Sequence, residues 1–139
     1  MSKIRFDGYY YLFTLKNNIK HSYVQVLRFF NENNKVISVT HVTHYFCFGS
    51  FFPSENWFNE KYEDSGNFKI IENEISFYCS SEEGKVSYKG KILNDDELEL
   101  FSHSYINGYE QTKIYKFIPF DVLKDIRDLD ERKWFICLK

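Results

Sequence analysis

The sequence predicts a mainly β protein, in which an antiparallel up-and-down meander of about eight strands closes into a barrel. Apolar and polar residues alternate with period two over most of the chain, as in strands with one buried face. Aromatic residues make up 20% of the 139 residues and alanine is absent, which favours pleated sheets over helical bundles. Short turns rich in Asn, Asp and Gly separate the alternating segments.

Eight alternating segments predict the strands. Asn31-Glu32-Asn33-Asn34 separates the second from the third and predicts a hairpin, because asparagine tolerates the left-handed backbone conformation. Glu72-Asn73 and Asn94-Asp95-Asp96 predict two further tight turns. The strands are expected at about Gly8–Leu15, Ser22–Phe30, Lys35–Thr43, Asn67–Ile71, Glu74–Ser80, Lys85–Leu93, Glu97–Ile106 and Gln111–Ile118.

Two segments instead have the spacing of helices. Pro53–Glu63 begins with a proline, which is tolerated at a helix start, and its aromatic residues recur at helical spacing. Pro119–Asp130 has one apolar stripe surrounded by charged residues. Trp134–Leu138 is then either a ninth strand or a segment that packs on this helix.

The chain length fits one domain over residues 1–139, with a barrel over about 6–118 and a C-terminal helical appendage over 119–139. Closing the meander removes two sheet edges that would otherwise promote aggregation. A barrel of eight strands is either filled by its own side chains or holds one small ligand.

The order of these segments resembles a known family over about residues 6–119. Asp7-Gly8-Tyr9-Tyr10 precedes the strand Tyr23–Phe30; Gly66-Asn67-Phe68-Lys69-Ile70 and Tyr115-Lys116-Phe117 follow in order. This pattern is similar to the small lipocalin-like proteins of the calycin superfamily, especially bacterial members of unassigned function. The resemblance implies a barrel that binds a small hydrophobic or amphipathic molecule. Secreted lipocalins have a Gly-x-Trp motif where this chain has Gly8-Tyr9-Tyr10, which argues against transport of an extracellular ligand.

Charge and cysteine content restrict the partners and the compartment. The formal net charge is −2, and without a basic run we expect no nucleic-acid partner. No apolar run of about 18 residues suggests a membrane span, so we expect no membrane partner. The chain starts without the apolar core of a signal peptide, and its three cysteines lack CxxC spacing. We therefore expect a cytoplasmic protein with free thiols.

One cluster has residue types that bind zinc: His41, His44 and Cys47, with His103 or Cys79 as a fourth ligand. On an extended strand, however, residues three apart point to opposite faces. The sequence therefore favours surface histidines and a buried cysteine, with no metal and no cofactor.

Catalytic signatures are lacking. Ser102-His103-Ser104 has the residue types of a nucleophile and its base, but neighbours along a strand face opposite sides. There is no Gly-x-Ser-x-Gly elbow and no Gly-rich phosphate loop. The acidic run Asn94-Asp95-Asp96-Glu97 differs in ligand spacing from a calcium-binding loop and fits a hairpin turn better. An enzyme is the less favoured class.

Polar residues in phase with inward-facing apolar ones are the best binding candidates. Such groups would orient a guest in a ligand cavity, or they would bond to each other or to water in a filled barrel. The sequence leaves both arrangements open. The six candidates for ligand binding are Tyr23, Gln25, Tyr88, Ser102, Ser104 and Tyr115.

Two classes of function follow. The first is a binding module for a small apolar or amphipathic ligand inside the barrel. The alternative is a non-enzymatic interaction protein, such as an immunity, phage or host-defence factor, that uses the barrel as a scaffold for a protein partner. Its surface would come from the appendage over 119–139 and from the aromatic residues Phe30, Phe48, Phe51 and Phe52.

Overall fold

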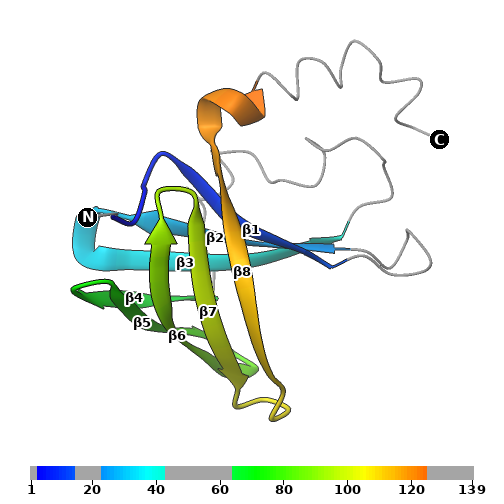
Figure 1. The fold of residues 1–139 in the computed structure, drawn as a ribbon. Helices are drawn as coiled ribbons and strands as arrows, with labels where there is room; N and C mark the ends of the chain where they lie inside the picture. Colours follow the sequence, from blue (N-terminus) through cyan, green and yellow to red (C-terminus); the bar gives the residue numbers. More distant parts are fainter. Residues whose placement is uncertain (1–2, 15–22, 43–63, 125–139) are drawn as a thin grey trace, which may run out of the picture.

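The computed structural model describes residues 3–14, 23–42 and 64–124. Eight strands lie in these ranges, in the predicted order (Figure 1). Their bounds are β1 (Gly8–Thr14), β2 (Tyr23–Phe30), β3 (Lys35–Val42), β4 (Ser65–Ile71), β5 (Glu74–Ser81), β6 (Gly84–Asn94), β7 (Glu97–Ser104) and β8 (Glu110–Pro119).

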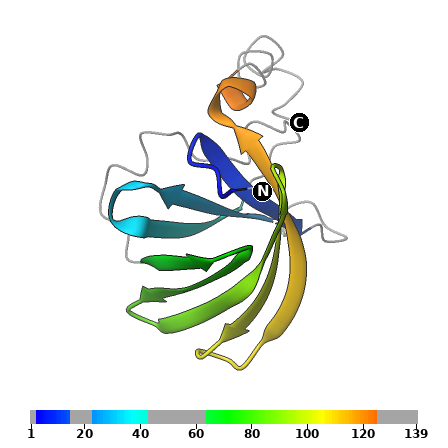
Figure 2. The ribbon, with the colours of Figure 1, turned by 60° about the vertical axis from the view of Figure 1, so that its left-hand side comes forward.

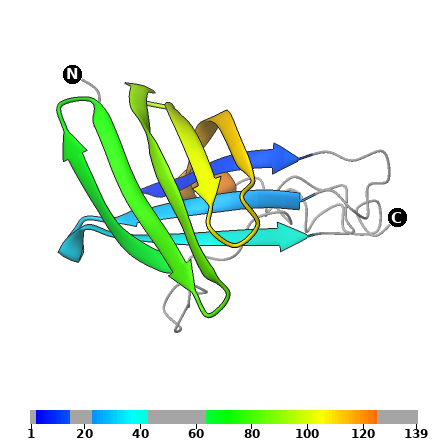
Figure 3. The same ribbon diagram turned by 90° about the horizontal axis from the view of Figure 1, so that it is seen from below.

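The strands form a closed antiparallel barrel in meander order, which confirms the predicted fold class. Each strand pairs with the next along the chain, and β1 pairs with β8 to close the sheet. At this closure Gly8 lies opposite Pro119, and Tyr10 lies opposite Phe117. Figures 2 and 3 show the sheet curling from β1 around to β8.

The turns follow the chemistry expected of their residues. The short 3-10 turn η2 (Glu32–Asn34) joins β2 to β3, with Asn33 and Asn34 at positive φ. At the end of β7 the prediction was two residues too long: the expected strand reached Ile106, whereas β7 ends at Ser104. The cause is the loop that follows, in which the Ser104 amide donates to the Tyr109 carbonyl and the Gly108 amide donates to the Ser104 carbonyl.

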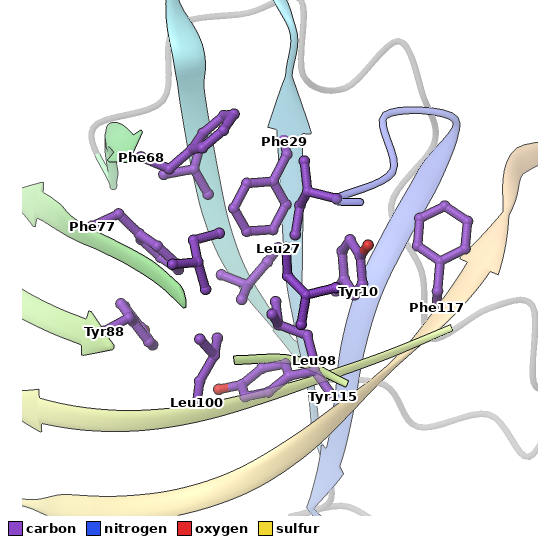
Figure 4. Close-up of a cluster of buried hydrophobic side chains, with 14 of the residues drawn as sticks. Tyr10, Leu27, Phe29, Phe68, Phe77, Tyr88, Leu98, Leu100, Tyr115 and Phe117 are labelled. Atoms are coloured by element: carbon purple, nitrogen blue, oxygen red, sulfur yellow. The ribbon is translucent and has the colours of Figure 1, made fainter. Parts of the chain in front are cut away.

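One face of every strand contributes to a core inside the barrel. Its side chains are aromatic or branched and are almost fully buried, which supplies the main apolar burial of the fold. Phe29 stands edge-on to Phe68 and Phe77 at ring-centroid distances of 5.2 and 5.5 Å, a favoured arrangement of aromatic pairs. Figure 4 shows this core with Leu27, Phe29 and Leu98 near its centre.

A second core lies on the outer side of β1, β2 and β3. Tyr9, Val24, Val26 and Ile37 are buried there although they point away from the barrel interior. Residues 120–124 are helical and follow β8 directly, which agrees with the predicted start of the C-terminal helix. Leu123 of this helix packs into the outer core and is only 2% exposed.

One end of the barrel is covered by the segment that precedes β1. Ile4 is buried in the inner core, and the Arg5 amide donates to the Tyr10 hydroxyl. The Arg5 guanidinium pairs with Asp7 and Asp96 and lies 4.1 Å from the centroid of the Phe117 ring.

The seam between β3 and β4 is the shortest pairing of the barrel. Its register covers three residue pairs, from Lys35 opposite Asn67 to Ile37 opposite Ser65, whereas β2 and β3 share eight. The predicted helix at Pro53–Glu63 lies outside the described residues. Within the described ranges, no helix is long and apolar enough to cross a membrane.

Candidate functional site

Three of the six predicted site residues are brought together inside the barrel by strands far apart in the sequence. Gln25 comes from β2, Tyr88 from β6 and Tyr115 from β8. Tyr88 and Tyr115 are buried, and all three point into the interior because they alternate with outward-facing neighbours along their strands. Figure 4 shows Tyr88 and Tyr115 extending inward on either side of Leu100.

Gln25 is the centre of a polar network, which we call the Gln25 network: Gln25, Ser38, Tyr88 and Tyr115. The Gln25 side-chain amide donates to the Tyr88 hydroxyl at 2.8 Å and to Ser38 Oγ at 3.1 Å. The Tyr115 hydroxyl donates to Gln25 Oε1 at 2.6 Å. Each bond offsets the cost of removing these groups from water.

The network keeps hydrogen-bonding capacity of its own. Gln25 donates one amide hydrogen to the Tyr88 hydroxyl and the other to the Ser38 hydroxyl. Both hydroxyls act as acceptors in these bonds, so the hydrogen of each hydroxyl is not used in them. One of the two can donate to the other. The three hydrogen bonds of the network use neither of these hydroxyl hydrogens, so the pair can donate to a further acceptor.

The other predicted residues lie around this network. Ser102 is buried and lies opposite Tyr88 in the β6–β7 register, so it extends the polar surface toward β7. Tyr23 shares the inward face of β2 but is only half-buried. The Ser104 hydroxyl accepts from the Ile106 amide at 3.2 Å, so it is engaged by the turn after β7.

Burial dominates the electrostatics of the network. Loss of solvent raises the pKa of both Tyr88 and Tyr115 well above that of a free phenol, so both hydroxyls are neutral donors at physiological pH. The Cys79 thiol is buried nearby, and its pKa is also raised by burial. Asp64 follows the same trend: desolvation, and to a smaller extent Glu83, raises the pKa of its carboxyl group.

The surroundings favour an uncharged guest. Desolvation is the main cause of the raised pKa values of Tyr88, Tyr115 and Cys79, so a carboxylate placed close to the network would lose its hydration. The network offers neutral hydroxyl and amide groups. A carbonyl or hydroxyl oxygen is therefore a better match for the spare donor than a carboxylate.

Sequence reasoning missed Ser38, which completes the network. The sequence places Ser38 in phase with Val36, on the same face of β3, but this phase alone does not show that the serine is buried, as it is in the structure. Asp64 carries no such signal, since it precedes β4. Its backbone carbonyl accepts from the Ser38 amide at 3.0 Å, which places it beside the network.

The other sequence clusters take non-catalytic places where the structure describes them. His103, one of the two alternative fourth ligands, faces outward and contacts Glu110 at 2.8 Å, whereas the other, Cys79, faces the inner core. His44 and Cys47 lie outside the described residues, and no metal-binding group of three such residues is found within those ranges. Asn94-Asp95-Asp96-Glu97 forms a turn, with the Asp96 amide donating to Asn94 Oδ1 at 2.8 Å.

Comparison with family models, with curated proteins and with solved structures found no significant match to this chain.

Proposed function

We propose that this protein is a binding module for a small, uncharged and mostly apolar molecule, whose acceptor oxygen bonds to the Gln25 network inside the barrel. The proposal includes a lipocalin-like mode of binding, in which the closed meander surrounds its ligand. The spare hydroxyl hydrogen of the Tyr88–Ser38 pair carries the proposal. Such a donor costs free energy inside an apolar core unless an acceptor meets it.

The side chains near the network divide into the two parts that such a ligand needs. Tyr88, Tyr115, Ser38 and Ser102 offer polar groups on one side. Leu27, Phe29 and Leu100 offer apolar surface deeper in the barrel (Figure 4). An amphipathic guest would place its oxygen at the network and its hydrocarbon part among these apolar side chains.

Native mass spectrometry of freshly purified protein, followed by titration with a medium-chain methyl ketone and the corresponding carboxylic acid, tests the proposal. We expect the ketone to bind more tightly than the acid, because the carboxylate would lose its hydration among these buried groups. Tyr88→Phe should weaken ketone binding by about 1 kcal/mol, the worth of one neutral hydrogen bond. Tyr78→Phe is the matched control, since Tyr78 lies on the outer face and is 52% exposed.

Two results would argue against this function. Equal binding of ketone and acid would show that the network does not select the ligand. Equal effects of Tyr88→Phe and Tyr78→Phe would place the ligand outside the barrel.

A second candidate function is supported by a different surface. Tyr105, Ile106 and Tyr109 form the loop between β7 and β8 and are about half exposed or more. Contiguous exposed apolar side chains often mark contacts with protein partners. Phe30, predicted to be exposed for this purpose, instead packs against the outer core, and Phe48, Phe51 and Phe52 lie outside the described residues. A protein that copurifies in fixed stoichiometry, and is lost when the three loop residues are replaced by serine, would favour this function.

A further inference from the structure

A hollow of about 350 Å³ lies on the outer face of the barrel, across β4, β5 and β6. The strand register places Ser76 between Lys69 and Lys89, each directly opposite it on a neighbouring strand. Tyr78 and Ser87 face each other in the next row. The short side chains of Ser76 and Ser87 therefore lie among the longer side chains of Lys69, Lys89 and Tyr78.

The hollow has a local charge opposite to that of the whole chain. The chain has a formal net charge of −2, yet the charged residues that line the hollow are Lys69 and Lys89. One row further along β6, Lys91 has Glu74 opposite it on β5 and Glu99 opposite it on β7. Lys91 is therefore flanked by two carboxylates that offset its positive charge. Lys69 and Lys89 instead have the uncharged residue Ser76 between them.

These side chains match the chemistry of a phosphate group. Cβ atoms of directly opposite residues are about 5 Å apart, so two lysines that flank one residue lie within reach of a single oxyanion. Two ammonium groups and the Ser76 and Ser87 hydroxyls together supply charge-assisted and neutral hydrogen bonds. Phosphate offers enough acceptor oxygens to use several of these donors at once.

Tyr78 adds an aromatic wall to this polar floor. Its side chain is 52% exposed, and Lys85 Nζ lies 5.0 Å from the centroid of its ring. Lys85 Nζ is also 5.0 Å from the Tyr105 ring, so one ammonium group lies between two aromatic side chains at the edge of the hollow. A flat ring beside Tyr78 would gain apolar contact without leaving the reach of the lysines.

We propose that this hollow binds a small aromatic phosphate monoester. Its phosphate group lies over Ser76 between Lys69 and Lys89, and its ring lies against Tyr78. The volume, near the lower end of the range for small-molecule sites, suits a single ring with one phosphate group. Phe77 and Tyr88 also line the hollow, but their side chains belong to the inner core, whereas Lys69, Ser76 and Lys89 are exposed on the outer face. The proposal uses only these outward-facing groups and Tyr78, so it does not depend on the function proposed above.

Phenyl phosphate, inorganic phosphate and phenol are the probes, added to the whole protein at low ionic strength and followed by the NMR shifts of backbone amides. We expect phenyl phosphate to bind most tightly, with the largest shifts at Ser76, Ser87 and Lys89. Added salt should weaken the binding, since exposed charges are screened.

Lys69→Gln combined with Lys89→Gln should weaken phenyl phosphate binding by about tenfold, because both ammonium groups that flank the phosphate are removed. Lys91→Gln removes the same charge from the same strand and face, and should change the affinity less than about twofold. A urea midpoint of the double variant equal to that of the unaltered protein shows that the barrel is intact.

Three results would overturn the proposal. Shifts distributed over the surface instead of the hollow would show that no site exists. If Lys91→Gln lost as much affinity for phenyl phosphate as the double variant, the effect would come from the general positive charge of this surface and not from the hollow. Equal affinities for inorganic phosphate and phenyl phosphate would remove the role of Tyr78.

Discussion

Cys79 shows how burial controls chemistry inside this barrel. Its side chain is 1% exposed, and desolvation raises the pKa of its thiol far above the usual value. The thiolate, which is the reactive form, is therefore nearly absent at neutral pH. The sequence predicts free thiols, and Cys79 is free in the structure.

We predict that Cys79 stays unmodified by iodoacetamide in the native protein at pH 8 and reacts fully in denaturant. Peptide mapping by mass spectrometry measures this for Cys79 alone. Alkylation of the native protein at the rate of a free thiol would contradict the inward placement of Cys79.

The Gln25 network makes a second prediction about single residues. Gln25→Leu removes three hydrogen bonds and leaves two buried tyrosine hydroxyls without their glutamine partner. We expect the free energy of unfolding to fall by about 2 kcal/mol. Adding Tyr88→Phe and Tyr115→Phe to this variant should recover part of the loss, because the orphaned hydroxyls are removed as well. Urea unfolding of the two variants tests this; a triple variant that is less stable than Gln25→Leu would contradict it.

The network also changes what Tyr88→Phe is expected to do. From the sequence, this substitution should affect ligand binding with little loss of stability. In the structure the Tyr88 hydroxyl accepts from Gln25, so its removal leaves one amide hydrogen unpaired. A stability loss of about 1 kcal/mol therefore accompanies the loss of binding.

At the scale of elements, the pairing of β6 with β7 depends on a glycine in the middle of β6. Gly90 lies in the middle of the strand, and a Cβ atom added there would be 1.7 Å from the Glu99 carbonyl oxygen. We predict that Gly90→Ala lowers the free energy of unfolding by about 2 kcal/mol, because the β6 and β7 backbones must move apart. Lys91→Ala, at the exposed neighbour, should change it by less than about 0.5 kcal/mol. Equal urea midpoints for the two variants would contradict this close approach.

Period-two alternation predicted the strands well because each strand has one face inside the barrel. The Asn31–Asn34 turn was predictable for a related reason, since few residues other than asparagine and glycine adopt positive φ easily. The outer core was not predicted. Tyr9, Val24 and Ile37 lie on the faces of their strands that point away from the barrel interior. The alternation does not show that Leu123, from the helix after β8, covers them.

The candidate site shows the same limit. Alternation placed Gln25, Tyr88 and Tyr115 on inward faces, but it does not give the cross-barrel distances that make them one network. Ser38 was missed because a small polar residue on a strand does not show whether it is buried. Such contacts depend on strand register and barrel closure, which are properties of the whole sheet.

At the scale of the whole molecule, the buried tyrosines make stability depend on alkaline pH. Burial raises the pKa of Tyr10 to about 12, and it also raises the pKa of Tyr88 and Tyr115. Between pH 10 and 12 the unfolded chain therefore loses phenolic protons that the folded protein keeps. Stability is fully present below pH 10 and is lost as pH rises through this window.

We predict that Tyr10 alone contributes about 2 to 3 kcal/mol to this loss. Urea midpoints measured at pH 8, 10 and 11 should fall steeply between the last two values. In Tyr10→Phe the fall should be smaller, since one titrating group is gone. A midpoint that does not change from pH 8 to 11 would contradict the burial of these tyrosines.

The central claim is that the Gln25 network receives an acceptor-bearing ligand inside the closed barrel. NMR titration with a medium-chain methyl ketone, followed at the side-chain amide of Gln25, tests it most directly. We predict that the side-chain amide resonances of Gln25 shift and reach a plateau as ketone is added. The side-chain amide of Asn67 donates to the Asn33 carbonyl on the barrel exterior, and its resonances should not shift. Shifts at Asn67 with none at Gln25 would contradict the claim.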